Sequence, residues 1–316
     1  MKRFALLFSI VVAVALAGCG NKQPDSTATT KYVIGMSQCN LGEPWRVQMN
    51  NDLKAAASKY PEIKMIFKDA QNNTTTQQSQ VKELVDQLVD LIIISPKEAL
   101  PLTKPVADAM AAGVPVIVLD RRVEGDKYTC FIGGNNELIG EQAGKYMVGL
   151  LGGKGNIVEL KGLMTSTPAA ERHNGFMKGI KGSKIKIVYS ADCHWLEPDA
   201  RREMASALTR FPGADDIAAV YAHNDPSAHG AYTAAKLEGK GRETTIKFIG
   251  IDALPHEGVT YVRDKMLNAT FQYPTGGSEA IETAMKILNG ETVDKDIILG
   301  TRVFTSDNVA EGGRAL

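Results

Sequence analysis

Polar side chains that suit hydroxyl recognition come at the ends of several apolar runs. Asp120 and Arg121 directly follow the apolar run 114–119, and Asn224 and Asp252 come at the ends of similar runs. Carboxylate and amide oxygens accept hydrogen bonds and a guanidinium donates them, so together they match hydroxyl groups, which do both. No Ser, His and Asp set in a nucleophile-elbow context accompanies them. The pattern therefore favours binding over catalysis.

The same composition recurs wherever a predicted strand ends. The segments concerned are rich in Asp, Asn, Gln, Arg and Trp, and they are 38–46, 69–73, 95–96, 120–121, 161–172, 192–195, 223–225 and 252–254. An indole ring can stack on the apolar CH face of a pyranose or furanose. Planar polar groups combined with aromatic faces predict a monosaccharide site.

The elements that position these residues alternate between strand and helix from Lys31 onward. Predicted strands are 32–36, 63–67, 90–94, 114–119, 156–160, 185–190, 217–222 and 246–251, and predicted helices include 45–60, 77–89, 169–180, 198–210 and 227–237. The rhythm restarts after the segment 130–135, which predicts two doubly wound, Rossmann-like parallel-sheet lobes. Ligands of such sheets bind beyond the carboxyl ends of the strands, where the polar segments fall.

The first residues predict export and a lipid anchor. Met1-Lys2-Arg3 is basic, residues 4–17 form an almost unbroken apolar run, and Leu16-Ala17-Gly18-Cys19 has the pattern of a lipobox. We expect a signal peptide over 1–18, a lipidated Cys19, and a flexible polar tether within 19–30. The alternative is an ordinary secretory signal in which Cys19 falls by chance. Either way, the chain is expected in the cell envelope, outside the cytoplasm.

The charge balance and the cysteine content limit the partners, disulfides and metal sites that are expected. Lys plus Arg and Asp plus Glu both number 36, so nothing favours nucleic acid or an anionic membrane surface. Cys39, Cys130 and Cys193 are an odd set, for which buried thiols are favoured although a Cys39–Cys193 disulfide remains open. Cys193-His194 alone is a weak zinc signal. No metal and no cofactor are expected.

Five strand-end motifs carry a resemblance to a known family. They are Asp-Ala-Gln-Asn at 69–72, Leu-Asp-Arg at 119–121, Ala-Ala-Glu-Arg at 169–172, Tyr-Ala-His-Asn-Asp at 221–225 and Gly-Ile-Asp at 250–252. In this order and spacing the chain, from Lys31 to about Arg302, resembles the ribose/galactose-type periplasmic sugar-binding proteins of ABC transporters, the type I periplasmic binding proteins. Gln38, Trp45-Arg46 and the run 223–225 are most similar to the galactofuranose-binding type.

The resemblance implies a two-lobed clamp around one monosaccharide. Trp45 and Trp195 would stack on opposite faces of the sugar, Asp120 and Arg121 would grip it from the first lobe, and Gln272 would contact it at the hinge. The full set of expected ligand contacts is Gln38, Trp45, Arg46, Asp69, Asp120, Arg121, Arg172, Trp195, Asn224, Asp252 and Gln272. No catalytic residue is expected.

The family also implies a hinge of three chain crossings, near Gly134, Gln272 and Gly300. The lobes would then comprise 31–134 plus 273–300, and 135–272 plus 301–316. The implied function is that of a monomer that hands a sugar to the permease subunits of an ABC transporter. The alternative is a sensor of the same fold that presents a sugar or signal molecule to a chemoreceptor or histidine kinase.

Simpler roles compete at several positions. Trp45 could belong to a helix core, Arg172 could be an exposed helical arginine, and Asn224 and Asp252 could only cap helices. Three arginines around the site tilt slightly toward an acidic ligand, although neutral sugars are favoured. An enzyme using Asp120 with Asp252 is disfavoured because an arginine partner would keep each carboxylate ionised. A repressor is excluded by the export signal and the missing helix-turn-helix head.

Overall fold

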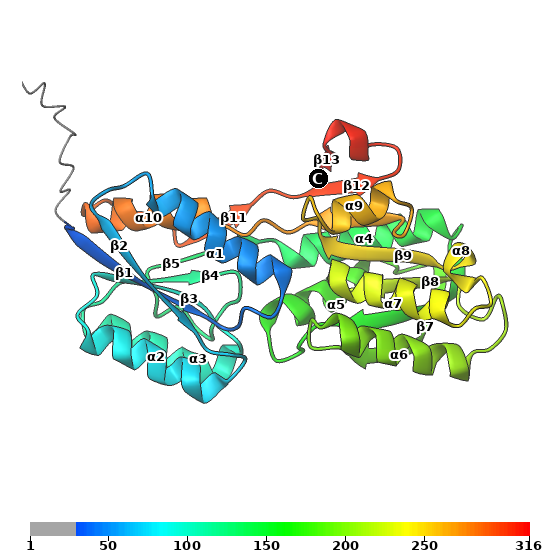
Figure 1. Ribbon diagram of the computed structural model, residues 1–316, viewed down its shortest axis with the longest axis horizontal. Helices are drawn as coiled ribbons and strands as arrows, with labels where there is room; N and C mark the ends of the chain where they lie inside the picture. The colour runs from blue at the N-terminus through cyan, green and yellow to red at the C-terminus, as the bar shows by residue number, and fades with distance from the viewer. Residues whose placement is uncertain (1–29) are drawn as a thin grey trace, which may run out of the picture.

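Two sheets, each covered by helices on both faces, form the molecule (Figure 1). The structure is a computed structural model that describes residues 30–316. The predicted signal peptide, Cys19 and almost all of the tether lie outside the described residues. The predicted α/β class with two parallel-dominated, doubly wound sheets is confirmed.

The first sheet is entirely parallel, with strand order β11-β5-β4-β3-β1-β2. Its strands are β1 (Tyr32–Gln38), β2 (Ile63–Asp69), β3 (Leu91–Ser95), β4 (Val116–Leu119), β5 (Cys130–Gly134) and β11 (Asp296–Leu299). Its helices are α1 (Pro44–Ala57), α2 (Thr74–Asp86), α3 (Ala99–Ala111) and α10 (Gly277–Leu288). Helices α1 and α10 cover one face, and α2 and α3 cover the other (Figure 1). This sheet and its helices are called the first lobe.

The second sheet has the order β13-β12-β10-β9-β8-β6-β7. Its strands are β6 (Lys154–Lys161), β7 (Lys184–Asp192), β8 (Ala219–Ala222), β9 (Lys247–Asp252), β10 (Ala269–Gln272), β12 (Arg302–Thr305) and β13 (Arg314–Ala315). Its helices are α4 (Asn136–Leu150), α5 (Thr167–Gly179), α6 (Glu197–Arg210), α7 (Asp225–Leu237), α8 (Arg242–Thr245) and α9 (Gly258–Arg263), with a 3-10 turn at Val309–Glu311. Strands β12 and β13 pair antiparallel, which the sequence did not predict. This is the second lobe.

Burial on both faces explains the short apolar strands. In β3 every residue is buried, and its side chains alternate between two apolar clusters. Ile92 and Ile94 pack toward α2 and α3, whereas Leu91 and Ile93 pack toward α1 and α10. β-branched side chains covered by helices on both faces favour a parallel strand. Rigid sheets of this kind hold the loops at their carboxyl ends in place.

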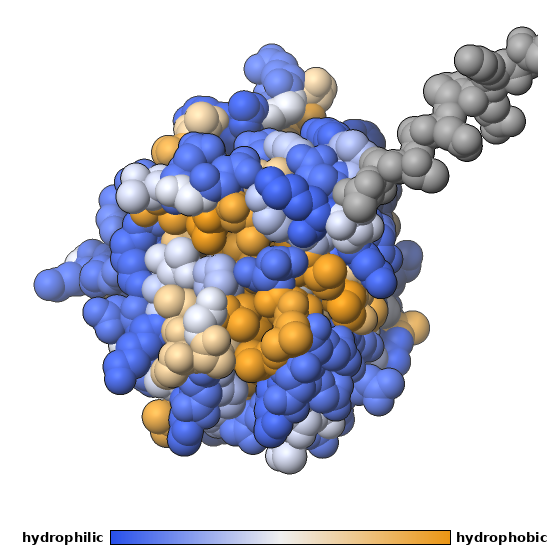
Figure 2. Space-filling model, turned by 90° about the vertical axis from the view of Figure 1, so that its left-hand side faces the viewer, coloured by the Kyte–Doolittle hydropathy of each residue, from blue (hydrophilic) through white to orange (hydrophobic). Residues whose placement is uncertain are grey.

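The chain passes between the lobes at three places: between β5 and α4, between β10 and α10, and between β11 and β12. One apolar cluster contains buried residues of both sheets, so the core is continuous through the crossings. Figure 2 views the end of the first lobe remote from the second, where apolar side chains lie among polar ones. Within residues 30–316, no helix combines the length and apolarity needed to span a bilayer.

The three cysteines of the described part are buried and unpaired, as favoured from the sequence. Burial raises the pKa of Cys130 to about 11 and that of Cys193 to about 12. Thiols held protonated in this way are poor nucleophiles. Cys130 and Cys193 are therefore packing residues.

Candidate functional site

The carboxyl ends of the two sheets line a pocket between the lobes. Its lining is Glu43, Trp45, Arg46, Asp120, Arg121, Pro168, Arg172, Trp195, Asn224, Asp252 and Tyr273. Eight of the eleven residues predicted as ligand contacts are among them. The sequence missed Glu43, Pro168 and Tyr273. Whether the eight contact a ligand stays a prediction.

Three pocket residues have an unusual backbone. The φ angle is +69° at Asp120, +71° at Trp195 and +128° at Asp252. Residues with a Cβ adopt this region rarely, and such strain gathers at functional sites because the surrounding structure holds it. The strain is consistent with side chains that are aimed into the pocket.

In the first lobe, Asp120 is the centre of a buried polar network. Its carboxylate accepts hydrogen bonds from Arg46 Nη1 at 2.6 Å and Ser95 Oγ at 3.0 Å, and Arg121 Nε lies 3.7 Å away. Burial by itself would raise the pKa of Asp120, but Arg46 and Arg121 lower it overall. Asp120 is therefore an ionised acceptor that is fixed before any ligand arrives.

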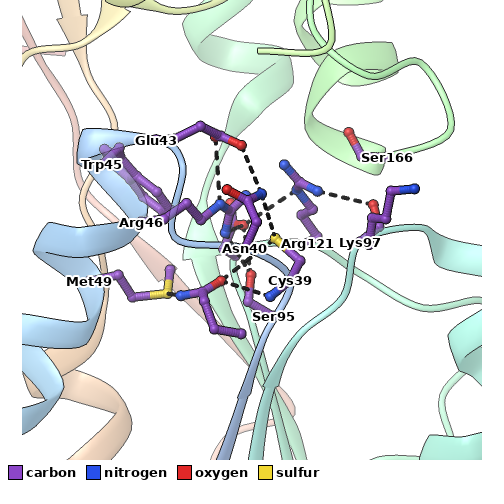
Figure 3. A network of polar contacts seen from close by, with 12 residues as sticks. Cys39, Asn40, Glu43, Trp45, Arg46, Met49, Ser95, Lys97, Arg121 and Ser166 are labelled. Atoms are coloured by element: carbon purple, nitrogen blue, oxygen red, sulfur yellow. Dashed lines mark hydrogen bonds and ion pairs between the residues drawn. The ribbon is translucent and has the colours of Figure 1, made fainter. Parts of the chain in front are cut away.

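Glu43 extends this network to the pocket wall. It precedes α1, is 8% exposed, and accepts a hydrogen bond from Asn40 Nδ2 at 2.9 Å. Arg46 Nε lies 3.7 Å from its other oxygen (Figure 3). An acidic residue in a loop is usually solvated, and no motif marks Glu43 in the sequence.

In the second lobe, Arg172 is held on several sides. Its Nε donates to Asn136 Oδ1 at 2.9 Å, and Nη1 donates to the carbonyl of His223. Asp252 lies 3.8 Å from Nη1, too far for a hydrogen bond. Burial, together with the nearby Asp225, raises the pKa of Asp252 well above its usual range despite Arg172. Arg172 therefore does not hold the pKa of Asp252 low, in contrast to the expectation from the sequence.

Both tryptophans of the chain line the pocket. Trp45 donates through Nε1 to the carbonyl of Tyr273 at 2.9 Å, so it contributes to the core as well as to the pocket. The guanidinium groups of Arg121 and Arg172 lie 5.6 Å and 5.3 Å from the Trp195 ring centroid, within cation–π range. Aromatic faces thus lie in both lobes.

Three buried N–H donors around the pocket have no partner within the described residues: Arg46 Nε, Arg121 Nε and Trp195 Nε1. Buried polar groups are almost always hydrogen-bonded in native structures. Oxygen acceptors of a ligand would satisfy these donors.

Asn224 combines two roles. Its Oδ1 accepts the backbone N–H of Ser227 at 3.1 Å, so the capping interpretation holds for this side chain. Its Nδ2 donates to the carbonyl of Trp195 at 3.0 Å, which fixes the strained turn that carries this ring. Asn224 also lines the pocket, and capping and ligand contact do not exclude each other here.

The structure does not bring the other three predicted contacts into the pocket lining. Gln38 turns into the first lobe, where Nε2 contacts Met49 Sδ and donates to Asn50 Oδ1 at 3.2 Å. Asp69, at the end of the edge strand β2, instead accepts the N–H of Gln71. Gln272 ends β10, and its neighbour Tyr273 faces the pocket instead.

The pocket lining holds acidic and basic groups in equal number, three arginines and the three carboxyl groups of Glu43, Asp120 and Asp252. Such a lining offers the hydroxyls of a ligand both acceptors and donors. No group of His, Cys, Asp and Glu within residues 30–316 is arranged to hold a metal ion.

A polar and aromatic pocket between two parallel-sheet lobes that are joined by three crossings is typical of two-lobed ligand-binding proteins. A comparison with family models matches residues 34–292 to the periplasmic binding protein domain. The chain belongs to this family, and within it to the ribose/galactose type.

Individual relatives agree with this assignment. The chain is 32% identical to the ribose import binding protein RbsB of Bacillus subtilis (strain 168), over 87% of this chain and 88% of the relative. The fructose-binding periplasmic domain of a hybrid two-component system is 43% identical, with a TM-score of 0.85 over 89% of this chain and 93% of that one. A galactofuranose-binding protein is 28% identical, with a TM-score of 0.84 over 89% and 96%. These relatives are named as binding proteins and not as enzymes.

Proposed function

We propose that this chain is an exported lipoprotein that binds one uncharged monosaccharide in the cleft and delivers it to the permease of an ABC transporter. The observation that carries the proposal is the pocket between the lobes, which has a tryptophan from each lobe and three N–H donors without a partner among residues 30–316. Hydroxyls accept from those donors and donate to Asp120 and Asp252, while the ring packs on indole. Ribose, fructose and galactofuranose, which the relatives' names give as ligands, are all uncharged.

Closure accounts for binding without catalysis. The proposed lobes, 31–134 with 273–300 and 135–272 with 301–316, would rotate about the three crossings and exclude water from the sugar. A wrong epimer would leave a buried donor or acceptor unpaired, at a cost of about 1–3 kcal/mol. The protein would act as a monomer.

Thermal unfolding of the full chain tests the ligand. The panel holds D-ribose, D-fructose, D-galactose, myo-inositol and D-glucuronate. A sugar at a hundred times its Kd stabilises the native state by about 2.7 kcal/mol, a readable rise in Tm. We expect an uncharged sugar to raise Tm and D-glucuronate to have no effect. A response to D-glucuronate alone would overturn the proposal for the cleft.

Sensing is a second candidate, because a fructose-binding sensor domain shares 43% of its residues with this chain. The pocket would serve either role, so only an experiment in cells distinguishes transport from sensing. Deleting the gene should abolish uptake of the radiolabelled sugar if the protein serves transport. Retained uptake with loss of the sugar-dependent transcriptional response would instead establish sensing.

The lipid anchor rests on the sequence motif at Cys19. Labelling of growing cells with radioactive palmitate should mark the wild-type chain and not the Cys19→Ser variant. A secreted, unlabelled wild-type protein would favour the ordinary secretory signal.

A further inference from the structure

Tyr273 occupies the junction of two chain crossings. It directly follows β10, is 3% exposed, and packs against Gly134 at the end of β5. A Cβ on Gly134 would lie only 2.7 Å from the Tyr273 ring. The glycine therefore leaves the space in which the ring lies between the lobes.

This one side chain touches ligand-facing residues of both lobes. The Tyr273 ring stacks on Trp45 with centroids 5.2 Å apart, and its hydroxyl donates to the backbone carbonyl of Asp120 at 3.2 Å. From the second lobe, the Arg172 guanidinium lies 4.5 Å from the ring centroid. Burial raises the pKa of Tyr273 well above its usual range, so the hydroxyl stays a donor.

Asn136 links the same hydroxyl to the second lobe. It is the first residue of α4, just beyond the first crossing, and it is 2% exposed. Its Nδ2 donates to the Tyr273 hydroxyl at 3.4 Å, and its Oδ1 accepts from Arg172 Nε at 2.9 Å. Asn136 does not line the pocket. A chain of hydrogen bonds thus runs from the Asp120 carbonyl through Tyr273 and Asn136 to Arg172.

The ends of this chain belong to different lobes. Opening of the cleft moves Asp120 away from Arg172, so at least one link must lengthen or break. All of these hydrogen bonds therefore form together only in the closed state. Hydrogen bonds within a single lobe, in contrast, persist when the cleft opens. Bonds that exist only in the closed state raise its population.

We propose that Tyr273 and Asn136 form a hinge relay, a pair of positioning residues that couples the ligand grip of the first lobe to that of the second. The proposal rests on the proposed binding of a sugar in the cleft. Apparent affinity falls in proportion to the closed, competent fraction. Loss of the relay should therefore weaken every ligand by the same factor and leave selectivity unchanged.

The test uses the full chain and its own fluorescence, because its two tryptophans both line the pocket. Wild type, Tyr273→Phe, Asn136→Ala and the double variant are titrated with D-ribose and D-fructose, and dissociation is followed by stopped flow. Tyr273→Phe keeps the ring and removes both hydroxyl bonds. We expect Kd to rise about 3–10-fold, mainly through faster dissociation. The double variant should stay within about 2-fold of Tyr273→Phe, because both changes break one chain.

Tyr146→Phe is the matched control. Its hydroxyl also donates to a backbone carbonyl, that of Asn268 at 3.2 Å, but within the second lobe. Its Kd should equal that of wild type. Unchanged dissociation in Tyr273→Phe, an equal loss in Tyr146→Phe, or an altered ribose-to-fructose preference would each overturn the relay.

A separate measurement distinguishes failure of the proposed sugar binding from failure of the hinge relay. If the wild type binds no sugar of the panel, the proposed function fails, and small-angle X-ray scattering of ligand-free proteins decides on the relay. Loss of closed-state bonds should then give Tyr273→Phe a larger radius of gyration than wild type. Equal radii would contradict the relay.

Discussion

The two lobes present the same residue type to the pocket in opposite electrostatic settings. In the first lobe, Asp120 lies between Arg46 and Arg121 and has a lowered pKa. In the second, Asp252 has only Arg172 at 3.8 Å, and its pKa is raised. The first lobe therefore holds a preformed ionised acceptor. The second holds a carboxyl whose charge is poorly compensated until a ligand supplies donors.

Neighbouring acids deepen the difference. Asp225 is buried beside Asp252, and burial raises its pKa to about 8. Within residues 30–316 the Asp252 side chain accepts no hydrogen bond, whereas Asp120 accepts two at 3.0 Å or less. We infer that the stability of the protein without ligand depends on the Asp120 network. The stability gained on ligand binding should arise mainly in the second lobe.

The largest expected effect is that of Asp120→Asn. The change removes the negative charge between two buried guanidinium groups and leaves Glu43, 3.7 Å from Arg46, as the remaining carboxylate of the network. We expect a loss of about 3 kcal/mol in unfolding free energy and loss of measurable sugar binding. Urea denaturation and titration calorimetry measure the two. Asp126→Asn, on the exposed loop after the same strand, should match wild type. If Asp120→Asn were as stable as the wild type, the inferred dependence of stability on the Asp120 network would be wrong.

The same substitution in the second lobe, Asp252→Asn, should not destabilise the ligand-free protein. Burial already opposes the charge of Asp252, so a neutral amide is expected to leave the unfolding free energy unchanged or to raise it. Sugar affinity should still fall about 10–100-fold, because a ligand hydroxyl loses one of the two carboxyl oxygens that can accept its hydrogen bond. Destabilisation equal to that of Asp120→Asn would show that the two lobes do not differ in this way.

The pH dependence of stability gives a third contrast, because Asp225 contacts only second-lobe residues. Its native pKa of about 8 exceeds the unfolded value of 3.8, so the native state binds more protons between these values. Stability should therefore fall steadily as pH rises from 4 to 8. Asp225→Asn keeps an acceptor for Thr270 and should flatten that slope. An unchanged slope, measured by denaturation at several pH values, would contradict the assignment.

Strand-end positions made much of the site predictable. Asp120, Asn224 and Asp252 come at the ends of strands that are apolar on both faces, and the fold brings such ends together. Arg172 gave no local signal, because an arginine early in a helix is normally solvated. Only the family pattern pointed to it.

The sequence could not identify the pocket residues to within one position. Successive side chains of an extended segment point in opposite directions, so a shift of one position exchanges Gln272 for Tyr273 at the pocket. Gln38 is buried against α1 for the same reason, while the loop beyond it supplies Glu43 and Trp45. The antiparallel β12 escaped prediction because only Val303 and Phe304 of its four residues are buried.

The smallest expected effect concerns a direct contact between the lobes, away from the pocket lining. Thr167 Oγ1 accepts the backbone N–H of Arg122 at 3.0 Å, and Thr165 O accepts that of Ala99 at 3.3 Å. Opening of the cleft breaks both bonds, so they favour the closed state. Thr167→Val removes one acceptor and should raise Kd about 3-fold for every sugar.

Thr209→Val controls for the substitution itself, because its hydroxyl bonds only to Ala205 within α6. Equal affinities of Thr167→Val and wild type would mean that closure depends on the pocket and hinge alone. If Kd rises by the same factor for ribose and fructose, Thr167 acts on the equilibrium between the open and closed states. If the factor differs between the two sugars, Thr167 instead affects how the second lobe contacts the sugar. The asymmetry between the lobes predicts the shared factor, because Thr167 accepts its hydrogen bond from the backbone of the preformed first lobe.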